Sequence, residues 1–215
     1  MESLRIQQGR LRGQKIKPPP PVSGNSHLTL NLVKEAIFQV LESRLGPDLE
    51  TYVFFDLCAG SGQMGFEAFS RGFAGVHLAE IDPGRLGHLI SEAKRGQFDV
   101  QIHRRDFRRM APLVFRHPRS VIFLDPPYSF WQGGESEAVD RLVYNLAHPS
   151  EESLAELQRH REAGEAFDLW FVVHGPGEYT PTVPFAPGSS SLYIAEMERR
   201  DYRKQRICLL KFALS

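Results

Sequence analysis

The alternation of apolar and polar positions along the chain predicts a sheet that is covered by helices. Short runs are apolar throughout, as expected for strands buried on both faces. They lie at residues 52–57, 76–81, 100–103, 121–124 and 167–174. Helices are predicted at residues 63–71, 83–95 and 135–148, and a further, polar and acidic helix at residues 151–163. Because strands and helices alternate, the sequence predicts an α/β fold with a mostly parallel, doubly wound sheet.

Both ends of the chain depart from this rhythm. The first 22 residues combine cations with spaced apolar residues and two glycines, which predicts a basic β-hairpin followed by a proline linker at 18–21. A helix is expected at residues 31–44, with Thr29 or Asn31 as its cap. Residues 191–198 and 205–212 are predicted to form a hairpin that closes the sheet with an antiparallel last strand. We therefore expect a hairpin segment over 1–22 and an α/β domain over 23–215.

Composition narrows the possible classes of protein. The 215 residues include 26 basic and 26 acidic side chains, which argues against a simple electrostatic nucleic-acid binder but leaves room for a local basic patch. The two cysteines lie in apolar runs and are expected to be reduced. No apolar run approaches the ~20 residues of a membrane span, and no secretory signal is recognised, so a cytoplasmic protein is expected. The eight histidines show no metal-ligand spacing, and no metal is expected.

A glycine-rich turn follows the first predicted strand. Residues 60–65 read Gly-Ser-Gly-Gln-Met-Gly, and Glu80 stands at the end of the second strand, where a carboxylate can accept ribose hydroxyls. This pairing predicts a nucleoside-bearing cofactor. The spacing matches the dinucleotide fingerprint, whereas Asp56, four residues before the first glycine, is typical of S-adenosylmethionine sites. A tight turn without a ligand is the third possibility, and we favour S-adenosylmethionine.

The sequence Asp125-Pro126-Pro127-Tyr128 follows the fourth predicted strand. In an open sheet this position faces the ligand, at the same edge as the glycine turn. Asp125 and the Pro126 carbonyl can accept both hydrogens of an exocyclic amine, and Tyr128 offers a face on which a base can stack. An incidental strand-ending turn is the alternative, but the order and position of the two motifs favour a functional site.

Together these segments resemble a known family. The basic hairpin, the helix at residues 33–41, the glycine turn and the Asp-Pro-Pro-Tyr sequence are similar to those of class I S-adenosylmethionine-dependent methyltransferases. More narrowly, the chain resembles the bacterial 16S ribosomal RNA guanine-N2 methyltransferase family. The resemblance implies a Rossmann-like fold with a seven-stranded sheet, and methyl transfer to the N2 amine of guanine in 16S ribosomal RNA. It also implies ribosomal RNA or the small subunit as partner, no metal, and a monomer.

The resemblance assigns roles to individual residues. Those expected at the cofactor are Asp56, Cys58, Ala59, Gly60, Ser61, Gly62, Glu80, Ile81, Asp106, Phe107 and Asp125. Within this set, Asp106 and Phe107 would lie at the adenine. Asp125, Pro126 and Tyr128 would act on guanine. The residues expected to contact RNA are Arg5, Arg10, Arg12, Lys15, Lys17 and Lys34.

The chain also departs from the family pattern. His27-Leu28-Thr29 replaces the usual Arg-Pro-Thr, residues 151–165 look like an insert, and His174-Gly175 stands where an acid is common. His174 itself is expected to be a strand-end or surface residue. Phe130 and Trp131 could form a lid over the base or pack locally. The rival functions are a DNA adenine-N6 or cytosine-N4 methyltransferase, a dinucleotide-dependent oxidoreductase, and a catalytically silent RNA-binding assembly factor.

Overall fold

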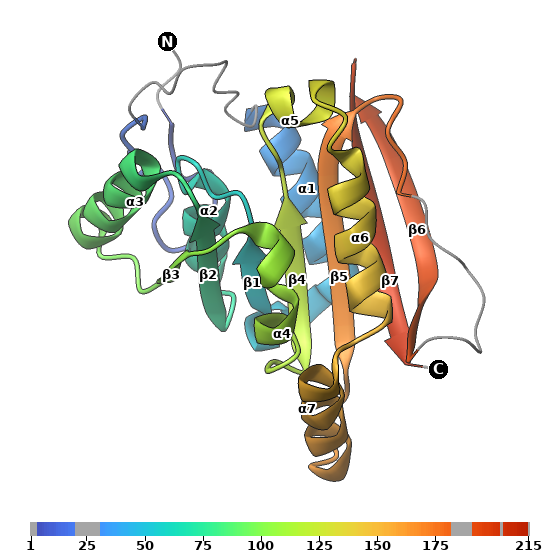
Figure 1. The fold of residues 1–215 in the computed structure, drawn as a ribbon. Helices are drawn as coiled ribbons and strands as arrows, with labels where there is room; N and C mark the ends of the chain where they lie inside the picture. The colour runs from blue at the N-terminus through green and yellow to red at the C-terminus, as the bar shows by residue number, and fades with distance from the viewer. Residues whose placement is uncertain (1–3, 20–30, 182–190, 203, 215) are drawn as a thin grey trace. The chain divides into compact units, whose positions relative to one another are not determined.

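The computed structural model describes residues 4–19, 31–181, 191–202 and 204–214 (Figure 1). The chain divides into two compact units, residues 1–107 and 108–215. In the described part of the chain, no helix is both long enough and apolar enough to span a bilayer. Neither cysteine forms a disulfide; Cys208 is buried and Cys58 is half-buried.

The first unit contains three parallel strands in the order β3-β2-β1. They are β1 (Val53–Asp56), β2 (Gly75–Glu80) and β3 (Gln101–Arg104). The helices of this unit are α1 (Asn31–Leu45), α2 (Gln63–Arg71) and α3 (Pro83–Gly96), and η1 (Gly46–Thr51) joins α1 to β1. Every residue of β1 is buried, both the apolar residues 53–55, as expected for a strand covered on both faces, and the charged Asp56 at its end. The parallel register places Asp56 and Glu80 at the carboxyl ends of neighbouring strands.

Two residues, Asp82 and Pro83, specify the start of α3. The Asp82 side chain caps the helix by accepting the backbone N–H of Arg85 at 2.8 Å. Pro83 occupies the first helical turn, where its missing N–H costs nothing. The helix ends at Gln97, which adopts a left-handed conformation with φ of 55°.

The N-terminal segment folds back on itself as predicted, although the pairing is short. A single antiparallel bridge joins Arg5 and Lys15, and the N–H of Ile6 donates to the carbonyl of Gln14 at 3.0 Å. Leu4, Ile6 and Ile16 are buried, so the hairpin packs its apolar side chains inward. Pro20, Pro21 and the candidate cap Thr29 lie outside the described residues.

The second unit contains two parallel strands and an antiparallel pair, in the order β4-β5-β7-β6. These strands are β4 (Arg119–Leu124), β5 (Asp168–Pro176), β6 (Leu192–Tyr202) and β7 (Gln205–Leu214). The helices are α4 (Ala111–Val114), α5 (Tyr128–Gln132), α6 (Ser136–Ala147) and α7 (Glu151–Glu162), and η2 (Phe107–Arg109) lies at the junction between the units. The apolar side of α6 covers the sheet of this unit (Figure 1).

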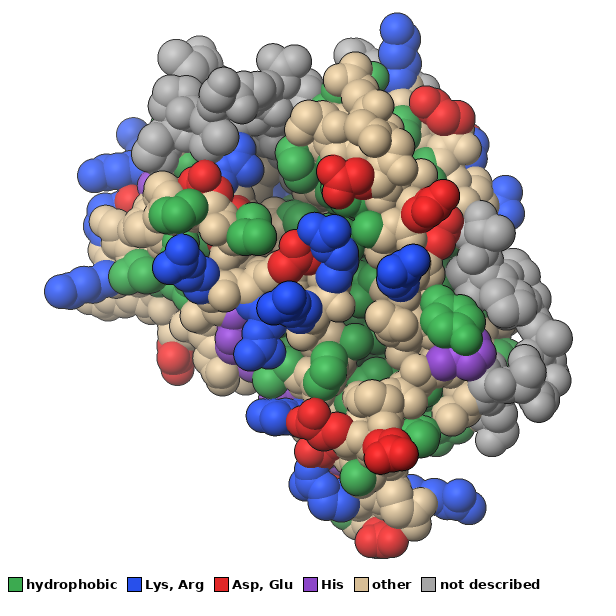
Figure 2. Space-filling model, viewed as in Figure 1, with side chains coloured by type: hydrophobic (Ala, Val, Ile, Leu, Met, Phe, Trp, Pro, Cys, Tyr) green, Lys and Arg blue, Asp and Glu red, His purple; other side chains and the backbone are tan. Residues whose placement is uncertain are grey.

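The helix α7 corresponds to the segment expected to be an insert. It extends beyond the amino ends of β4 and β5, away from α5 (Figure 1). Its His160 contacts the carbonyl of Phe115 through Nε2 at 3.0 Å and so fixes the helix to the segment before β4. Acidic side chains occupy its first turn and basic ones its last, which leaves mixed charge on its surface (Figure 2).

The seven strands confirm the predicted fold class, a mostly parallel α/β sheet with an antiparallel last strand. The predicted helix and strand boundaries hold to within one or two residues in the central part of the chain. The short helix α5 and the 3₁₀ turn η1 were not expected. The division of the chain into 1–22 and 23–215 remains a prediction.

Candidate functional site

The glycine turn after β1 has the backbone that only glycine adopts readily. Gly60 and Gly62 have φ of 51° and 76°, in the left-handed region. A Cβ on Gly62 would fall 2.5 Å from the Phe66 ring, whereas one on Gly60 would meet nothing closer than 3.8 Å. The turn is therefore packed tightly against α2 at its second glycine and has space beside its first. A ligand can approach the backbone at Gly60.

Asp56 ties the turn to the first turn of α2. Its side chain is buried, and its Oδ2 accepts the backbone N–H of Gly65 at 3.3 Å. A carboxylate at this position is stabilised by the partial positive charge of the helix N-terminus. Asp56 thus has a structural role in addition to the cofactor contact that the sequence predicts.

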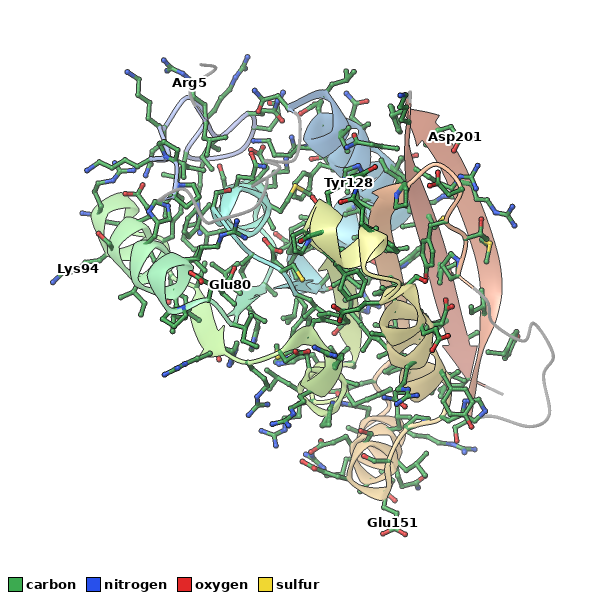
Figure 3. All side chains as sticks on the ribbon, turned by 45° about the horizontal axis from the view of Figure 1, so that its top comes forward. Arg5, Glu80, Lys94, Tyr128, Glu151 and Asp201 are labelled. Carbon is green, nitrogen blue, oxygen red and sulfur yellow. The ribbon has the colours of Figure 1, made fainter. Side chains whose placement is uncertain are left out.

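Glu80 connects the end of β2 to the glycine turn. Its Oε2 accepts the N–H of Gly60 at 3.0 Å, and its Oε1 accepts the N–H groups of Ile81 and Asp82 at 2.8 and 2.9 Å. Three backbone donors therefore fix the orientation of this buried carboxylate (Figure 3). A carboxylate oxygen can accept two hydrogen bonds, so Oε2 can take a ribose hydroxyl without losing Gly60.

Beside Glu80, the structure provides an apolar surface. Ile81 follows Glu80 directly and is 61% exposed, which is unusual for an isoleucine at the end of a buried strand. Asp106 is half-buried and Phe107 is buried. An oriented carboxylate, an open glycine backbone and an exposed aliphatic side chain fit a nucleoside with a purine base. The residues present are thus suited to an adenosyl cofactor.

The Asp-Pro-Pro-Tyr sequence lies at the carboxyl end of β4, as predicted. Asp125 follows the last residue of this buried strand, and its side chain is 20% exposed. Pro127 has φ of −60° and precedes α5, which begins at Tyr128. Tyr128 is 47% exposed and projects from the start of that helix (Figure 3). A carboxylate and an accessible aromatic ring are therefore close together at this strand end.

His174 contacts Asp125, which the sequence analysis missed. Its Nδ1 lies 3.0 Å from Asp125 Oδ1, and the imidazole is buried, so the expectation of a surface residue is wrong. Burial lowers the pKa of His174, but the carboxylate of Asp125 together with the Gln205 side chain raises it, and the net pKa lies above the usual value. The parallel register pairs Leu124 with Val173, so the residues that follow them become neighbours. That register is a property of the folded sheet, so no signal in the sequence pointed to the contact.

Phe130 and Trp131 pack locally in this structure. Phe130 is buried, and the Trp131 ring lies 4.6 Å from the ring of Tyr179. Trp131 also covers Gly175, where an added Cβ would lie 2.9 Å from the indole. Of the two alternatives for these aromatic residues, the structure shows the packed one.

Five of the six cations expected to contact RNA are exposed, and one is not. The exposed side chains are Arg5, Arg10, Arg12, Lys15 and Lys17. Lys34 is 0% exposed, and its Nζ lies 3.2 Å from Glu67 Oε2 and donates to the carbonyl of Arg5 at 2.8 Å. An RNA phosphate cannot reach this ammonium group, so the expectation for Lys34 is wrong. Its role is to hold the hairpin to α1 and α2.

Comparison with known proteins identifies the family. The model of the family described as "Conserved hypothetical protein 95" matches residues 4–172. The chain belongs to this family. It is 30% identical over 165 residues to the Ribosomal RNA small subunit methyltransferase D of Escherichia coli K12, covering 75% of this chain and 77% of that protein. It is also 32% identical over 130 residues to the putative rRNA methyltransferase YlbH of Bacillus subtilis 168, covering 58% and 67% of the two chains.

A solved structure supports the same fold. The putative methyltransferase yhhF from Escherichia coli aligns over the whole of both chains with a TM-score of 0.61 and 21% identity. This likeness confirms the Rossmann-like class I methyltransferase fold. The predicted family of small-subunit ribosomal RNA methyltransferases is likewise confirmed, and S-adenosylmethionine is the cofactor of that class of enzyme.

Proposed function

We propose that this protein transfers a methyl group from S-adenosylmethionine to the exocyclic N2 amine of a guanine in 16S ribosomal RNA. The observation that carries the proposal is the Asp-Pro-Pro-Tyr sequence at the end of β4, in a chain with a glycine turn and an oriented Glu80. The relationship to small-subunit ribosomal RNA methyltransferases supports RNA as the substrate.

The residues of the first unit hold the cofactor in this proposal. Glu80 accepts the ribose hydroxyls, Ile81 packs against the adenine, and Asp106 meets the adenine amino group. The turn around Gly60 receives the methionine end, close to Asp56. When bound, the cofactor supplies an electrophilic methyl group on a positively charged sulfur.

The residues of the second unit orient the amine. Asp125 and the Pro126 carbonyl accept its two hydrogens, which leaves the nitrogen lone pair directed at the methyl carbon. Tyr128 stacks on the guanine and keeps its ring in plane. The new bond joins this nitrogen to the methyl carbon, the bond between that carbon and sulfur breaks, and sulfur keeps the electron pair. The methylated nitrogen then carries a positive charge, which Asp125 stabilises until one amine proton passes to water.

The exposed cations of the hairpin bind the RNA backbone. Contacts to phosphate position a substrate without reading its sequence, which suits a short basic segment. We propose a monomer that acts in the cytoplasm on ribosomal RNA or the small subunit, without a metal. The segment His27-Leu28-Thr29, whose departure from the family pattern bears on the substrate, lies outside the described residues.

Two rivals predict different products. A DNA methyltransferase uses the same tetrapeptide, and a dinucleotide-dependent oxidoreductase uses the same glycine spacing. The fixed Asp56 carboxylate disfavours the oxidoreductase, because it would lie near a pyrophosphate of the same charge.

The test is the transfer of labelled methyl from S-adenosylmethionine to three substrates: small ribosomal subunits from cells lacking this protein, 16S RNA purified from them, and genomic DNA. Label in the ribosomal RNA supports the proposal. Label only in DNA establishes the DNA methyltransferase instead. If the cofactor binds and no substrate is labelled, the protein is a silent binder and the proposal is overturned.

A further inference from the structure

His174 occupies a position that the proposed chemistry does not yet use. It lies on β5 within the second unit and is buried, and the carboxylate it contacts is that of Asp125. The contact is 3.0 Å between Nδ1 and Oδ1, the length of a good hydrogen bond. A buried imidazole in a strand pays a desolvation cost, and here it gains its bond from a residue of the proposed site.

The surroundings of His174 come from two neighbouring strands. On one side Asp125 follows the last residue of β4, and on the other β7 pairs Ile207 with His174. The Gln205 side chain, also on β7, raises the pKa of His174 in the same direction as Asp125 does. Two other titratable groups of β7, Arg206 and Cys208, pair with the residues on either side of His174. Arg206 forms an ion pair with Asp201, which balances its charge.

We propose that His174 is a positioning residue, which donates from Nδ1 to Asp125 and fixes the plane of the carboxylate that accepts the amine hydrogens. The inference rests on the proposed function. It adds a residue on a second strand to the Asp-Pro-Pro-Tyr sequence, and it explains why a histidine is buried at this strand end.

Asp125 needs such a positioning residue because a carboxylate group rotates freely about its terminal torsion. The terminal torsion of aspartate is broad, so an exposed aspartate samples many orientations of its two oxygens. Methyl transfer requires the lone pair of the amine to point at the methyl carbon, and that direction depends on where the amine hydrogens are accepted. A buried donor on the rigid strand β5 restricts Asp125 to one orientation. In catalytic sites generally, hydrogen bonds from supporting residues hold the side chains that contact the substrate in productive geometry.

Two substitutions separate positioning from general stability. His174→Phe keeps a ring of similar size and removes the donor, whereas His174→Asn keeps a side-chain N–H close to the position of Nδ1. We expect His174→Phe to lower kcat by roughly 10–100-fold, the scale of a small misplacement of reacting groups. The KM for RNA and the Kd for S-adenosylmethionine should stay within about threefold, and His174→Asn should recover most of kcat.

The matched control is His160→Phe, which removes another buried histidine paired with a carboxylate, Glu165, at the base of α7. It should reduce thermal stability and leave kcat unchanged. All variants are assayed on small subunits well below their unfolding temperatures. If His174→Phe retains the kcat of the wild type while Asp125→Ala loses it, the inference is overturned and the proposed function stands. If the wild type methylates no ribosomal RNA, the proposed function fails and the inference fails with it.

Discussion

Three carboxylates at strand ends have different hydrogen-bond partners, and these partners indicate different roles. Asp56 accepts a backbone N–H from α2, and Glu80 accepts three from the turns beside it. Asp125 contacts a side chain, His174, and keeps one-fifth of its own side chain exposed. The first two therefore hold the backbone around the glycine turn and the end of β2 in shape. Asp125 is the one that can act on a substrate.

Substitution of Asp125 tests this assignment. Asp125→Ala removes an acceptor for the amine hydrogens, so kcat should fall by about 100-fold or more because the nitrogen is no longer oriented. The Kd for S-adenosylmethionine, measured by calorimetry, should change by less than about threefold. The control is Ser129→Ala, an exposed position on α5, which should preserve both values. Equal losses of turnover and cofactor affinity would contradict the role given to Asp125.

The His174 contact also predicts a pH dependence of stability. Because the pKa of His174 is raised in the folded protein, its contribution to the free energy of unfolding is complete below the ordinary histidine pKa of about 6.5. That contribution is lost as the pH rises through the folded value. Urea unfolding at several pH values between about 6 and 9 should show this loss in the wild type relative to His174→Asn. Parallel curves for the two proteins would contradict a raised pKa.

Individual residues could be predicted from the sequence where a motif fixes both position and chemistry. The glycine turn, Glu80 and the Asp-Pro-Pro-Tyr sequence are of this kind, because the end of a strand determines where they lie. His174 and Lys34 could not be assigned correctly. The contact of His174 depends on the register between β4 and β5, and the burial of Lys34 depends on how the hairpin covers α1.

At the scale of elements, a buried charge cluster attaches the hairpin to two helices. Lys34 on α1 and Arg71 on α2 both pair with Glu67, which also accepts the backbone N–H groups of Gln7 and Gln8. Burial lowers the pKa of Lys34, and Glu67 opposes the change. The hairpin is thereby held in one place on the first unit. Its cations are presented on a fixed backbone.

Removing one member of this cluster should be costly. Lys34→Met leaves Glu67 with one cation fewer in a buried environment, and loss of one partner of a buried pair costs about 3–5 kcal/mol. The free energy of unfolding should fall by about that amount, measured by urea denaturation. Lys94→Met, an exposed lysine on α3 (Figure 3), is the control and should change it by less than about 0.5 kcal/mol. A Lys34→Met protein as stable as the wild type would contradict the anchoring role.

The exposed cations of the hairpin predict a salt-dependent loss of RNA binding. Arg12→Ala with Lys15→Ala should weaken the affinity for small-subunit RNA and lower the slope of log K against log salt by roughly 0.7–0.9 per lost phosphate contact. The affinity for S-adenosylmethionine should be unchanged. Arg141→Ala with Arg161→Ala, two exposed arginines on α6 and α7, is the matched control. An unchanged salt slope in the hairpin variant would show that these two side chains do not contact RNA phosphates.

Elements were predictable to the extent that their periodicity was regular. Strands buried on both faces and helices with one apolar side have distinct patterns, so β1, β2, β4 and their connecting helices match the expected positions. The hairpin was predicted, but the shortness of its strand pairing was not. One antiparallel bridge joins its two arms, and hydrogen bonds to α2 and α3 hold the hairpin where a longer ladder would otherwise do so. The five-residue helix α5 is shorter than any window in which periodicity can be measured.

At the scale of the whole molecule, the family match and the fold agree with the motifs found in the sequence. The family match spans residues 4–172 and thus includes both the glycine turn and the Asp-Pro-Pro-Tyr sequence. The rest of the second unit, residues 173–215 with β6 and β7, adds the antiparallel end of the sheet. One fold supports many functions, so the fold alone does not specify the methyl acceptor, whereas the family match indicates a small-subunit ribosomal RNA methyltransferase.

In the proposed reaction the methyl group is transferred to the N2 amine of guanine in 16S ribosomal RNA. The most direct test is mass spectrometry of the nucleosides released from small subunits after reaction with wild-type protein and with Asp125→Ala. We predict N2-methylguanosine at one position of the 16S RNA with the wild type and little or none with the variant. Methylation of a different base or a different guanine atom, or equal product from both proteins, would contradict it.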